Sequence, residues 1–214
     1  IKNKAFGMLG SFGELVSTIL HWNEEVDAEI SAVKKRKLLE HYFNKVDDLE
    51  GGINKFTEFL ANPYGNTLYN KIIRILDDHP PDSELLEHLS AALKFIIKKE
   101  NFSSLFEQHK YVLSYIERLT PQALTIIADY ENWPYIKLDT SISFGPKVTS
   151  DWYSEFSKVY CNTKKVGDEE KIKRILHSVR EIERQGFAEA IKVKNNLTKC
   201  KLTFIGEELL AYIK

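Results

Sequence analysis

The side chains of this chain that could do chemistry are few, and none of them stands in a catalytic or metal-binding pattern. No two of its six histidines are four residues apart, as in a zinc-binding helix. They are His21, His41, His79, His88, His109 and His177. The sequence has no glycine-rich phosphate loop and no Gly-x-Ser-x-Gly nucleophile elbow. It therefore predicts a protein that is not an enzyme and that uses neither a metal ion nor a cofactor.

Two cysteines, Cys161 and Cys200, are the remaining candidates for chemistry. Cys161 follows Tyr160 and is a potential nucleophile, but no neighbouring motif supports that role, so a structural thiol is the prediction. One distant pair of cysteines without metal-ligand spacing is typical of buried thiols in a reducing compartment rather than of a disulfide. We therefore expect a cytoplasmic protein.

Basic side chains form the clearest candidate for a binding site. The 30 Lys and Arg residues are balanced by 31 Asp and Glu residues, so a net charge of −1 provides no overall attraction to nucleic acid. Binding to a polyanion must then come from a local cluster. The candidate residues are Lys171, Lys173, Arg174, His177, Arg180, Arg184, Lys192, Lys194, Lys199 and Lys201. Contacts from such side chains to phosphates suit DNA as a partner.

A helix that begins at Asp168 must position the first six of these residues. Acidic residues at its start favour the positive end of the helix dipole, and Gly186 after Arg184 is typical of a left-handed C-cap. The apolar residues of this helix recur at the spacing of one helical face, which leaves most basic residues on the other faces. They are Ile172, Ile175, Leu176, Val179 and Ile182.

After Gly186 the hydrophobic period changes from that of a helix to that of a strand. Ile191 and Val193 alternate with Lys192 and Lys194, and Cys200 and Leu202 alternate with Lys199 and Lys201. Asn195-Asn196 suits the turn between the two strands. The pattern predicts a hairpin with one apolar face and one lysine face. Thr203 then caps a final helix with Leu209, Leu210 and Ile213 turned inward.

The order of these elements resembles a winged helix. Arg184-Gln185-Gly186-Phe187 and Leu202-Thr203-Phe204-Ile205-Gly206 match the pattern of a helix, Gly, an apolar residue, a wing and Leu-Thr-x-x-Gly. The resemblance covers about 100 residues, and it implies that the helix before the wing lies in a DNA major groove while the wing contacts the backbone. Many winged helices bind protein instead, and that alternative stays open. Glu181 and Glu183 depart from the expected positive surface of a DNA reader.

A helical bundle over residues 1–104 is predicted ahead of this domain, which spans residues 105–214. The stripe of Phe6 to Trp22 suggests a core or dimer-packing helix; its polar face lacks the Lys/Arg enrichment of a membrane-surface helix. Asn23 to Ala61 reads as one helix weakened at Gly51-Gly52 or two helices bent there. Lys34 to Lys37 is expected to be solvated helix surface. We expect a homodimer through these helices.

Further helices are predicted over residues 67–78, 84–99, 105–119, 121–131 and 151–160, with a hinge at residues 101–104. Tyr135 to Ser150 has little helical period and contains Gly145-Pro146, so it reads as a loop with at most one extended segment. No stretch is long and apolar enough to span a bilayer. The predicted fold class is mainly α, a helical bundle followed by a winged-helix-like domain with one small hairpin.

The whole layout also resembles small bacterial proteins of the abortive-infection alpha type. The residues that carry this second resemblance are a helix at Leu85 to Ile97, the segment Ile116-Glu117-Arg118-Leu119-Thr120-Pro121 and the terminal Leu-Thr-x-x-Gly. The resemblance implies a bacterial or phage-related regulatory or defence protein that binds a macromolecule. The alternative is a protein–protein interaction module whose winged helix binds a protein partner.

Overall fold

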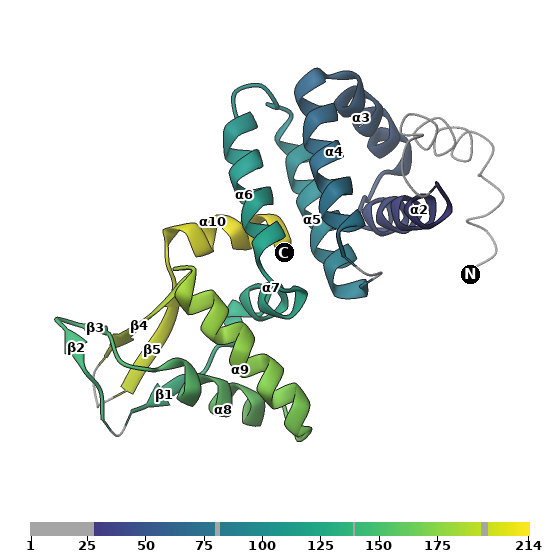
Figure 1. Cartoon of the computed structure of the whole chain (residues 1–214). Helices are drawn as coiled ribbons and strands as arrows, with labels where there is room; N and C mark the ends of the chain where they lie inside the picture. Colours follow the sequence, from purple (N-terminus) through teal and green to yellow (C-terminus); the bar gives the residue numbers. More distant parts are fainter. Residues whose placement is uncertain (1–27, 80–81, 139, 194–196) are drawn as a thin grey trace.

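The computed structural model of the chain describes residues 28–79, 82–138, 140–193 and 197–214. The described chain is mainly helical, with one small antiparallel sheet towards the C-terminus (Figure 1). This confirms the mainly α class. The helix predicted over Phe6–Trp22 and the turn predicted at Asn195-Asn196 lie outside the described residues.

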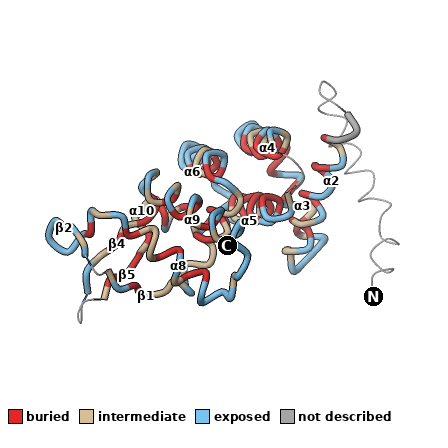
Figure 2. The backbone as a smooth tube through the Cα atoms, turned by 60° about the horizontal axis from the view of Figure 1, so that its bottom comes forward, coloured by how far each residue is buried: buried red, intermediate tan, exposed pale blue. Residues whose placement is uncertain are grey.

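The N-terminal part is a group of helices that share one apolar core. Its elements are α2 (Ala28–Asn44), α3 (Leu49–Ala61), α4 (Pro63–Asp77), α5 (Ser83–Lys99) and α6 (Phe106–Arg118). Side-chain caps start two of them: Asn62 accepts hydrogen bonds from the backbone at Tyr64 and Gly65, and Asp82 does the same at Glu84 and Leu85. Helix α5 lies at the centre, and more than half of its residues are buried (Figure 2).

The bend predicted at Gly51-Gly52 is in the wrong place. Helix α2 ends at Asn44 and α3 begins at Leu49, so both glycines lie in the first turns of α3. They matter because the connection folds back on them: a Cβ on Gly52 would meet Val46 Cγ1 at 2.6 Å, and one on Gly51 would meet Asp48 Oδ2 at 2.3 Å. The glycines therefore make room for the reversal rather than forming it.

The basic run Lys34 to Lys37 is only partly solvated. Arg36 and Lys37 are exposed, as predicted, whereas Lys34 and Lys35 are buried. The ammonium group of Lys34 donates to the carbonyl oxygens of Leu76, Asp77 and His79 at 3.2, 3.0 and 2.7 Å. A cation at the last carbonyls of a helix satisfies acceptors that have no partner within the helix. Lys34 therefore closes the C-terminal end of α4.

The C-terminal part combines helices with the sheet. Its elements are α7 (Pro121–Ala128), a 3-10 turn η2 (Tyr130–Asn132), β1 (Tyr135–Lys137), β2 (Ser143–Phe144), β3 (Lys147–Val148), α8 (Tyr153–Thr163), α9 (Glu169–Arg184), β4 (Ala188–Lys192), β5 (Leu197–Leu202) and α10 (Phe204–Ile213). The strand order is β1-β5-β4-β3-β2, and all neighbours are antiparallel. The predicted hairpin is confirmed as β4 and β5.

The loop predicted over residues 135–150 contains three short strands. They are only two or three residues long, so they leave almost no periodic signal in the sequence. Strand β1 is held by β5, and β3 is held by β4, both of which follow more than 40 residues later. The hairpin between β2 and β3 turns at Gly145, whose φ of +58° suits glycine.

The Leu-Thr-x-x-Gly segment has a clear structural task. The backbone N–H of Thr203 donates to the Phe187 carbonyl at 3.0 Å, and its hydroxyl donates to the Gly186 carbonyl at 2.6 Å. The same hydroxyl accepts a hydrogen bond from the Gly206 N–H at 3.4 Å, which caps α10. The segment thus ties the start of α10 to the end of α9, and Gly186 adopts the predicted left-handed conformation with a φ of +78°.

Helix α10 joins the two parts of the molecule. It contacts α5, α6 and α7, and its residues Leu209, Tyr212 and Ile213 belong to one apolar core that runs through the whole described chain (Figures 1 and 2). Two buried histidines of the bundle bind its end. His88 lies 3.2 Å from the Ile213 carbonyl, and His109 lies 2.6 Å from the Tyr212 hydroxyl.

Candidate nucleic-acid interface

Helices α8 and α9 form a helix–turn–helix unit that presents one helix to solvent. They pack together, and five residues that include Gly167 connect them. Helix α9 begins where it was predicted, and Asp168 caps it by accepting a hydrogen bond from the Lys171 N–H at 2.8 Å. Ile175, Val179 and Ile182 are buried, and α9 packs on α7, α8 and β4 through this face.

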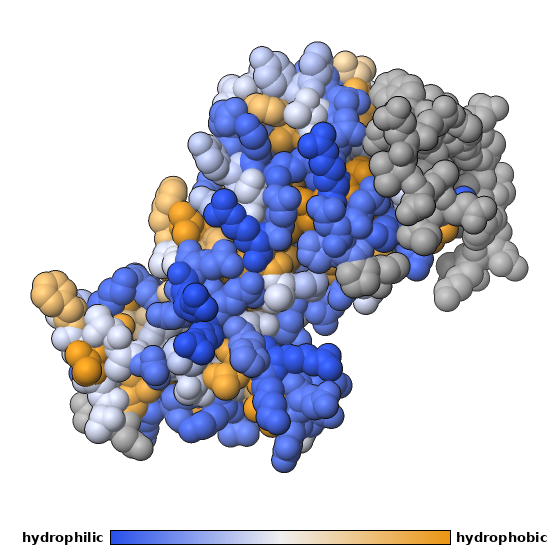
Figure 3. Space-filling view, viewed as in Figure 1, coloured by the Kyte–Doolittle hydropathy of each residue, from blue (hydrophilic) through white to orange (hydrophobic). Residues whose placement is uncertain are grey.

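The opposite face of α9 carries a stripe of four exposed basic residues, Lys173, His177, Arg180 and Arg184. Their spacing of four, three and four residues places them in one row, because a helix makes a turn every 3.6 residues. No carboxylate lies between the first and last residues of this row, whereas Glu169 stands one turn before Lys173. The surface along α9 is hydrophilic (Figure 3). We call these four residues the α9 stripe.

The two other predicted basic residues of α9 lie outside the stripe. Arg174 flanks it and is 3.5 Å from Glu170 one turn earlier. Lys171 precedes the buried Ile175 by four residues, so it continues the line of the buried face beyond the core. Within the stripe, the Arg180 guanidinium lies 5.5 Å from the ring centre of Tyr153 on α8, a cation–π contact that restrains this side chain.

The two glutamates that seemed to dilute the positive face are set to its sides. The Glu181 carboxylate accepts hydrogen bonds from the Thr120 hydroxyl at 2.8 Å and from the Thr120 N–H at 3.3 Å, so it serves the start of α7. Glu183 lies on the other flank and is half-buried. The stripe is therefore more uniformly basic than the sequence of the helix suggests.

The prediction that the lysines of the hairpin share one face is wrong in part. The register pairs Ala190 with Cys200 on the buried face, whereas Ile191 faces Lys199 on the other. The side chains of β4 thus face the opposite way from the prediction. The small side chains of Ala188 and Ala190, rather than those of Ile191 and Val193, face the helices. Lys192 shares the helix side of the sheet with Ala190, and Lys194 lies outside the described residues.

Lys199 and Lys201 lie on the face of the sheet that points away from the helices. We call this surface the outer sheet face. The register of the strands places on it Tyr135, Lys137, Phe144, Lys147, Glu189, Ile191, Leu197, Lys199 and Lys201. All nine are exposed or only partly buried, whereas Ile136, Val148, Ala188, Ala190, Thr198, Cys200 and Leu202 on the opposite face are buried. The helices cover that opposite face only.

One carboxylate stands among the four lysines of the outer sheet face. Glu189 lies 3.1 Å from the Lys201 ammonium group and 3.2 Å from that of Lys147. Partial burial of the Glu189 carboxyl acts to raise its pKa, but the hydrogen bonds from Lys201 and Lys147 outweigh that effect and hold the pKa below its usual value. Lys137 and Lys199 have no carboxylate within ion-pair distance in the described chain.

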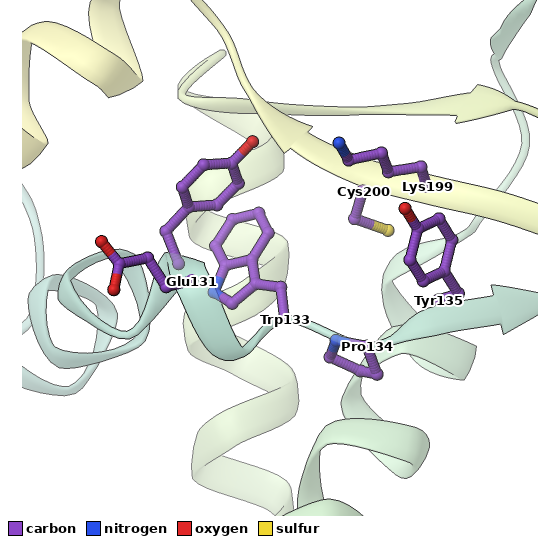
Figure 4. Close-up of a pocket in the computed structure, with 7 residues that line it drawn as sticks. Glu131, Trp133, Pro134, Tyr135, Lys199 and Cys200 are labelled. Atoms are coloured by element: carbon purple, nitrogen blue, oxygen red, sulfur yellow. The ribbon is translucent and has the colours of Figure 1, made fainter.

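A shallow pocket opens beside this face, next to β1. It has a volume of about 230 Å³ and is lined by Tyr130, Glu131, Trp133, Pro134, Tyr135, Lys199 and Cys200. The side chains of Trp133, Tyr135 and Lys199 lie around the same opening (Figure 4). The Trp133 ring is fixed, because its N–H donates to the Ile126 carbonyl at 2.8 Å and it packs edge-on against Phe156.

Both cysteine thiols are buried. Burial raises the pKa of the Cys200 thiol to about 12 and also raises that of the Cys161 thiol, so both stay protonated near neutral pH. No cluster of three or more metal-ligating side chains occurs among the described residues. In the same part of the chain, no helix is long and apolar enough to cross a membrane.

Four of the nine residues of the outer sheet face lie on strands that were not predicted. Tyr135, Lys137, Phe144 and Lys147 lie in the segment that read as a loop. Alternation of Tyr135 and Lys137 around Ile136 is the one local signal that could have placed them on a strand.

Comparison of the chain with protein-family models, curated proteins and solved structures gave no match.

Proposed function

We propose that this protein is a non-enzymatic regulator that binds duplex DNA through α9 of a winged-helix-like domain. The observation that carries the proposal is the α9 stripe: four exposed basic residues in one row, on the second helix of a helix–turn–helix unit. The confirmed hairpin that follows α9, and the pairing of β1 with β5 beside it, are compatible with such a domain.

The dimensions of the stripe suit a major groove. A rise of about 1.5 Å per residue places Lys173 and Arg184 about 16 Å apart along the axis, roughly half a turn of B-DNA. A major groove admits an α-helix, and the arginine and lysine side chains of such a helix bind either the guanine edges or the flanking phosphates. His177 is exposed in the middle of the row and adds a hydrogen-bond donor to the same surface. Of the hairpin lysines, Lys192 lies on the same side of the sheet as α9 and can contact the flanking phosphates.

The test is a salt titration of the full chain with a labelled duplex of random sequence. We expect the association constant to fall steeply with salt. The double substitution Lys173→Gln and Arg184→Gln removes two phosphate contacts, so the slope of log K against log salt should become shallower by about 1.8. Fluorescence anisotropy measures both quantities.

A matched control is available on α2, where Arg36 and Lys37 are adjacent and exposed. Arg36→Gln with Lys37→Gln removes the same two charges from the other part of the molecule. The slope should then stay unchanged. An equal loss in both double variants would mean that the duplex responds to total charge only, and α9 would not be the reader.

The second candidate function is recognition of a protein partner. It is favoured by the Lys147–Glu189–Lys201 cluster, because lysines already paired with a carboxylate are less available to phosphates. Phe204, with 80% of its surface exposed at the start of α10, is a suitable anchor for such a partner. Absence of duplex binding at low salt would favour this function. The roles in phage defence and in dimerisation rest on sequence resemblance and helix pattern alone.

A further inference from the structure

The outer sheet face combines features that duplex DNA does not need. It carries four lysines and one carboxylate, Glu189, which pairs with two of them, and aromatic rings stand among the lysines. Tyr135 has 55% of its surface exposed and Phe144 has 86%. A stacked duplex offers phosphates to the lysines but hides the faces of its bases from the rings. An exposed aromatic side chain next to unpaired cations therefore suggests a ligand with both phosphates and free bases.

The placement of Lys199 joins the two kinds of contact. The register puts it on β5 directly opposite Tyr135 of β1, and directly opposite Ile191 of β4 on its other side. The row of paired positions across the sheet therefore mixes two lysines with apolar and aromatic residues, in the order Tyr135, Lys199, Ile191, Lys147 and Phe144. Lys137 occupies the next position of β1 on the same face. A phosphate bound between Lys137 and Lys199 would bring the adjoining base to the Tyr135 ring.

The pocket beside β1 extends the same surface. Tyr135 and Lys199 form its near wall, and the fixed ring of Trp133 forms the far wall (Figure 4). A volume of about 230 Å³ is below the range of pockets that enclose a whole small-molecule ligand. It suits one planar ring inserted from a longer chain that continues across the sheet.

We propose that the outer sheet face is a second nucleic-acid site, which binds a single-stranded segment through Lys137, Lys147, Lys199 and Lys201 and stacks bases on Tyr135 and Phe144. This site is separate from α9, because the helices cover the opposite side of the sheet. Charge complementarity decides the occupant. Four ammonium groups stand against Glu189 on the face, and Glu131 at the pocket is paired with Lys214, so a cationic partner is disfavoured. The exposed rings favour bases over a bare polyanion.

The test uses a labelled single strand of 20 nucleotides with mixed sequence, bound to the full chain and measured by fluorescence anisotropy. Tyr135→Leu should weaken binding about tenfold or more, since one stacked base contributes on that scale. Tyr111 is a matched control, with 62% of its surface exposed on α6, and Tyr111→Leu should change nothing. Lys137→Gln with Lys199→Gln should make the salt slope shallower by about 1.4.

Two further ligands identify the source of the affinity. An abasic strand of equal length has the same phosphates without bases, and polyglutamate is a polyanion with neither. Both should bind at least tenfold more weakly than the complete strand. Equal binding of either ligand would overturn the proposal, because the rings would then contribute nothing. An unchanged affinity in Tyr135→Leu would overturn it as well.

The α9 variant separates this site from the proposed function. Lys173→Gln with Arg184→Gln should impair duplex binding and leave single-strand binding intact, whereas Tyr135→Leu should do the reverse. If the α9 variant abolishes single-strand binding, the strand lies on α9 and the outer sheet face is not its site. If duplex binding is absent from the wild-type chain but Tyr135→Leu still impairs single-strand binding, the second site stands without the first.

Discussion

Gly206 stands where the end of α9 and the start of α10 approach most closely. A Cβ at this position would lie 2.2 Å from the carbonyl oxygen of Phe187, which already accepts the Thr203 N–H. A backbone atom that is held by a hydrogen bond cannot easily move away. Gly206→Ala should therefore lower the free energy of unfolding by about 2 kcal/mol, as overpacking of a tight site does.

The measurement is urea denaturation followed by circular dichroism. Gly167→Ala is the matched control, since a Cβ on Gly167 meets nothing within 4 Å and its backbone is not left-handed. We expect that substitution to change the stability by less than about 0.5 kcal/mol. A Gly206→Ala protein as stable as the control would mean that the junction between α9 and α10 can relax.

Single residues with local partners were the most predictable part of the chain. Thr203 and the left-handed Gly186 were identified as caps because a cap depends on groups two or three residues away. Glu181 was misread for the opposite reason. Its partner Thr120 is 61 residues earlier, and nothing near Glu181 in the sequence indicates that its carboxylate turns aside from the basic row.

At the scale of elements, Glu189 controls how much of the outer sheet face is available to an anion. It holds Lys147 and Lys201 across two neighbouring strands. Glu189→Gln removes the charge and releases both lysines, so the affinity for a single strand should rise by roughly two- to fivefold. Fluorescence anisotropy at low salt measures the change.

Glu155 supplies the control for this substitution. It forms an exposed pair with Lys158 at 3.3 Å on α8, away from the outer sheet face. Glu155→Gln raises the net charge by the same amount and should leave the affinity unchanged. A rise in both variants would indicate a response to net charge rather than to the two released lysines.

The helices and the hairpin of β4 and β5 could be predicted because their patterns are local, whereas the facing of β4 and the pairing of β1 and β3 with this hairpin could not. The inward residues Ile175, Val179 and Ile182 of α9 follow from a repeat within one element. The facing of the β4 side chains is seen only in the folded sheet, where Ala188 and Ala190 are buried, and the pattern of Ile191 and Val193 predicted the opposite facing. The α9 stripe could therefore be predicted from the sequence.

The outer sheet face could not be predicted from the sequence for a related reason. Tyr135 and Lys199 are neighbours only because β1 pairs with β5 in one register out of several. A strand of three residues contains too little alternation to specify that register by itself. The site exists only in the folded sheet.

At the scale of the whole molecule, acid should loosen the joint between the bundle and the C-terminal part. Burial lowers the pKa of His109 to about 4, with a smaller contribution from the Lys99 charge, and burial also lowers the pKa of His88. Both histidines contact the end of α10. They are neutral in the folded chain, whereas in the unfolded chain they take up protons near the usual pKa of about 6.5.

The sign of the pH dependence follows from this difference. The stability that comes from neutral, buried histidine is complete above pH of about 6.5 and is lost as the pH falls towards 4, because only the unfolded chain binds protons in that window. We expect His109 to account for about 2 kcal/mol of this loss. Urea denaturation at a series of pH values measures it.

Substitutions at histidine assign the effect. His109→Phe removes the titrating group and should flatten the curve between pH 6.5 and 4, even if it changes the stability at neutral pH. His177, which is exposed on α9, is the control, and His177→Phe should leave the steepness of the curve between pH 6.5 and 4 unchanged. A curve of the same steepness in the His109→Phe protein would place the proton uptake elsewhere.

The position of α10 also has a consequence for synthesis of the chain. The surface of α5 that α10 covers is complete at Lys99, but the helix that covers it begins at Phe204. At roughly 5–20 residues per second, a ribosome needs about 5–20 s to bridge that interval. During this time Phe95 and its neighbours on α5 remain without Tyr212 and the other apolar side chains of α10. The nascent bundle therefore exposes an apolar surface that is prone to aggregation, and we expect chaperones to bind it.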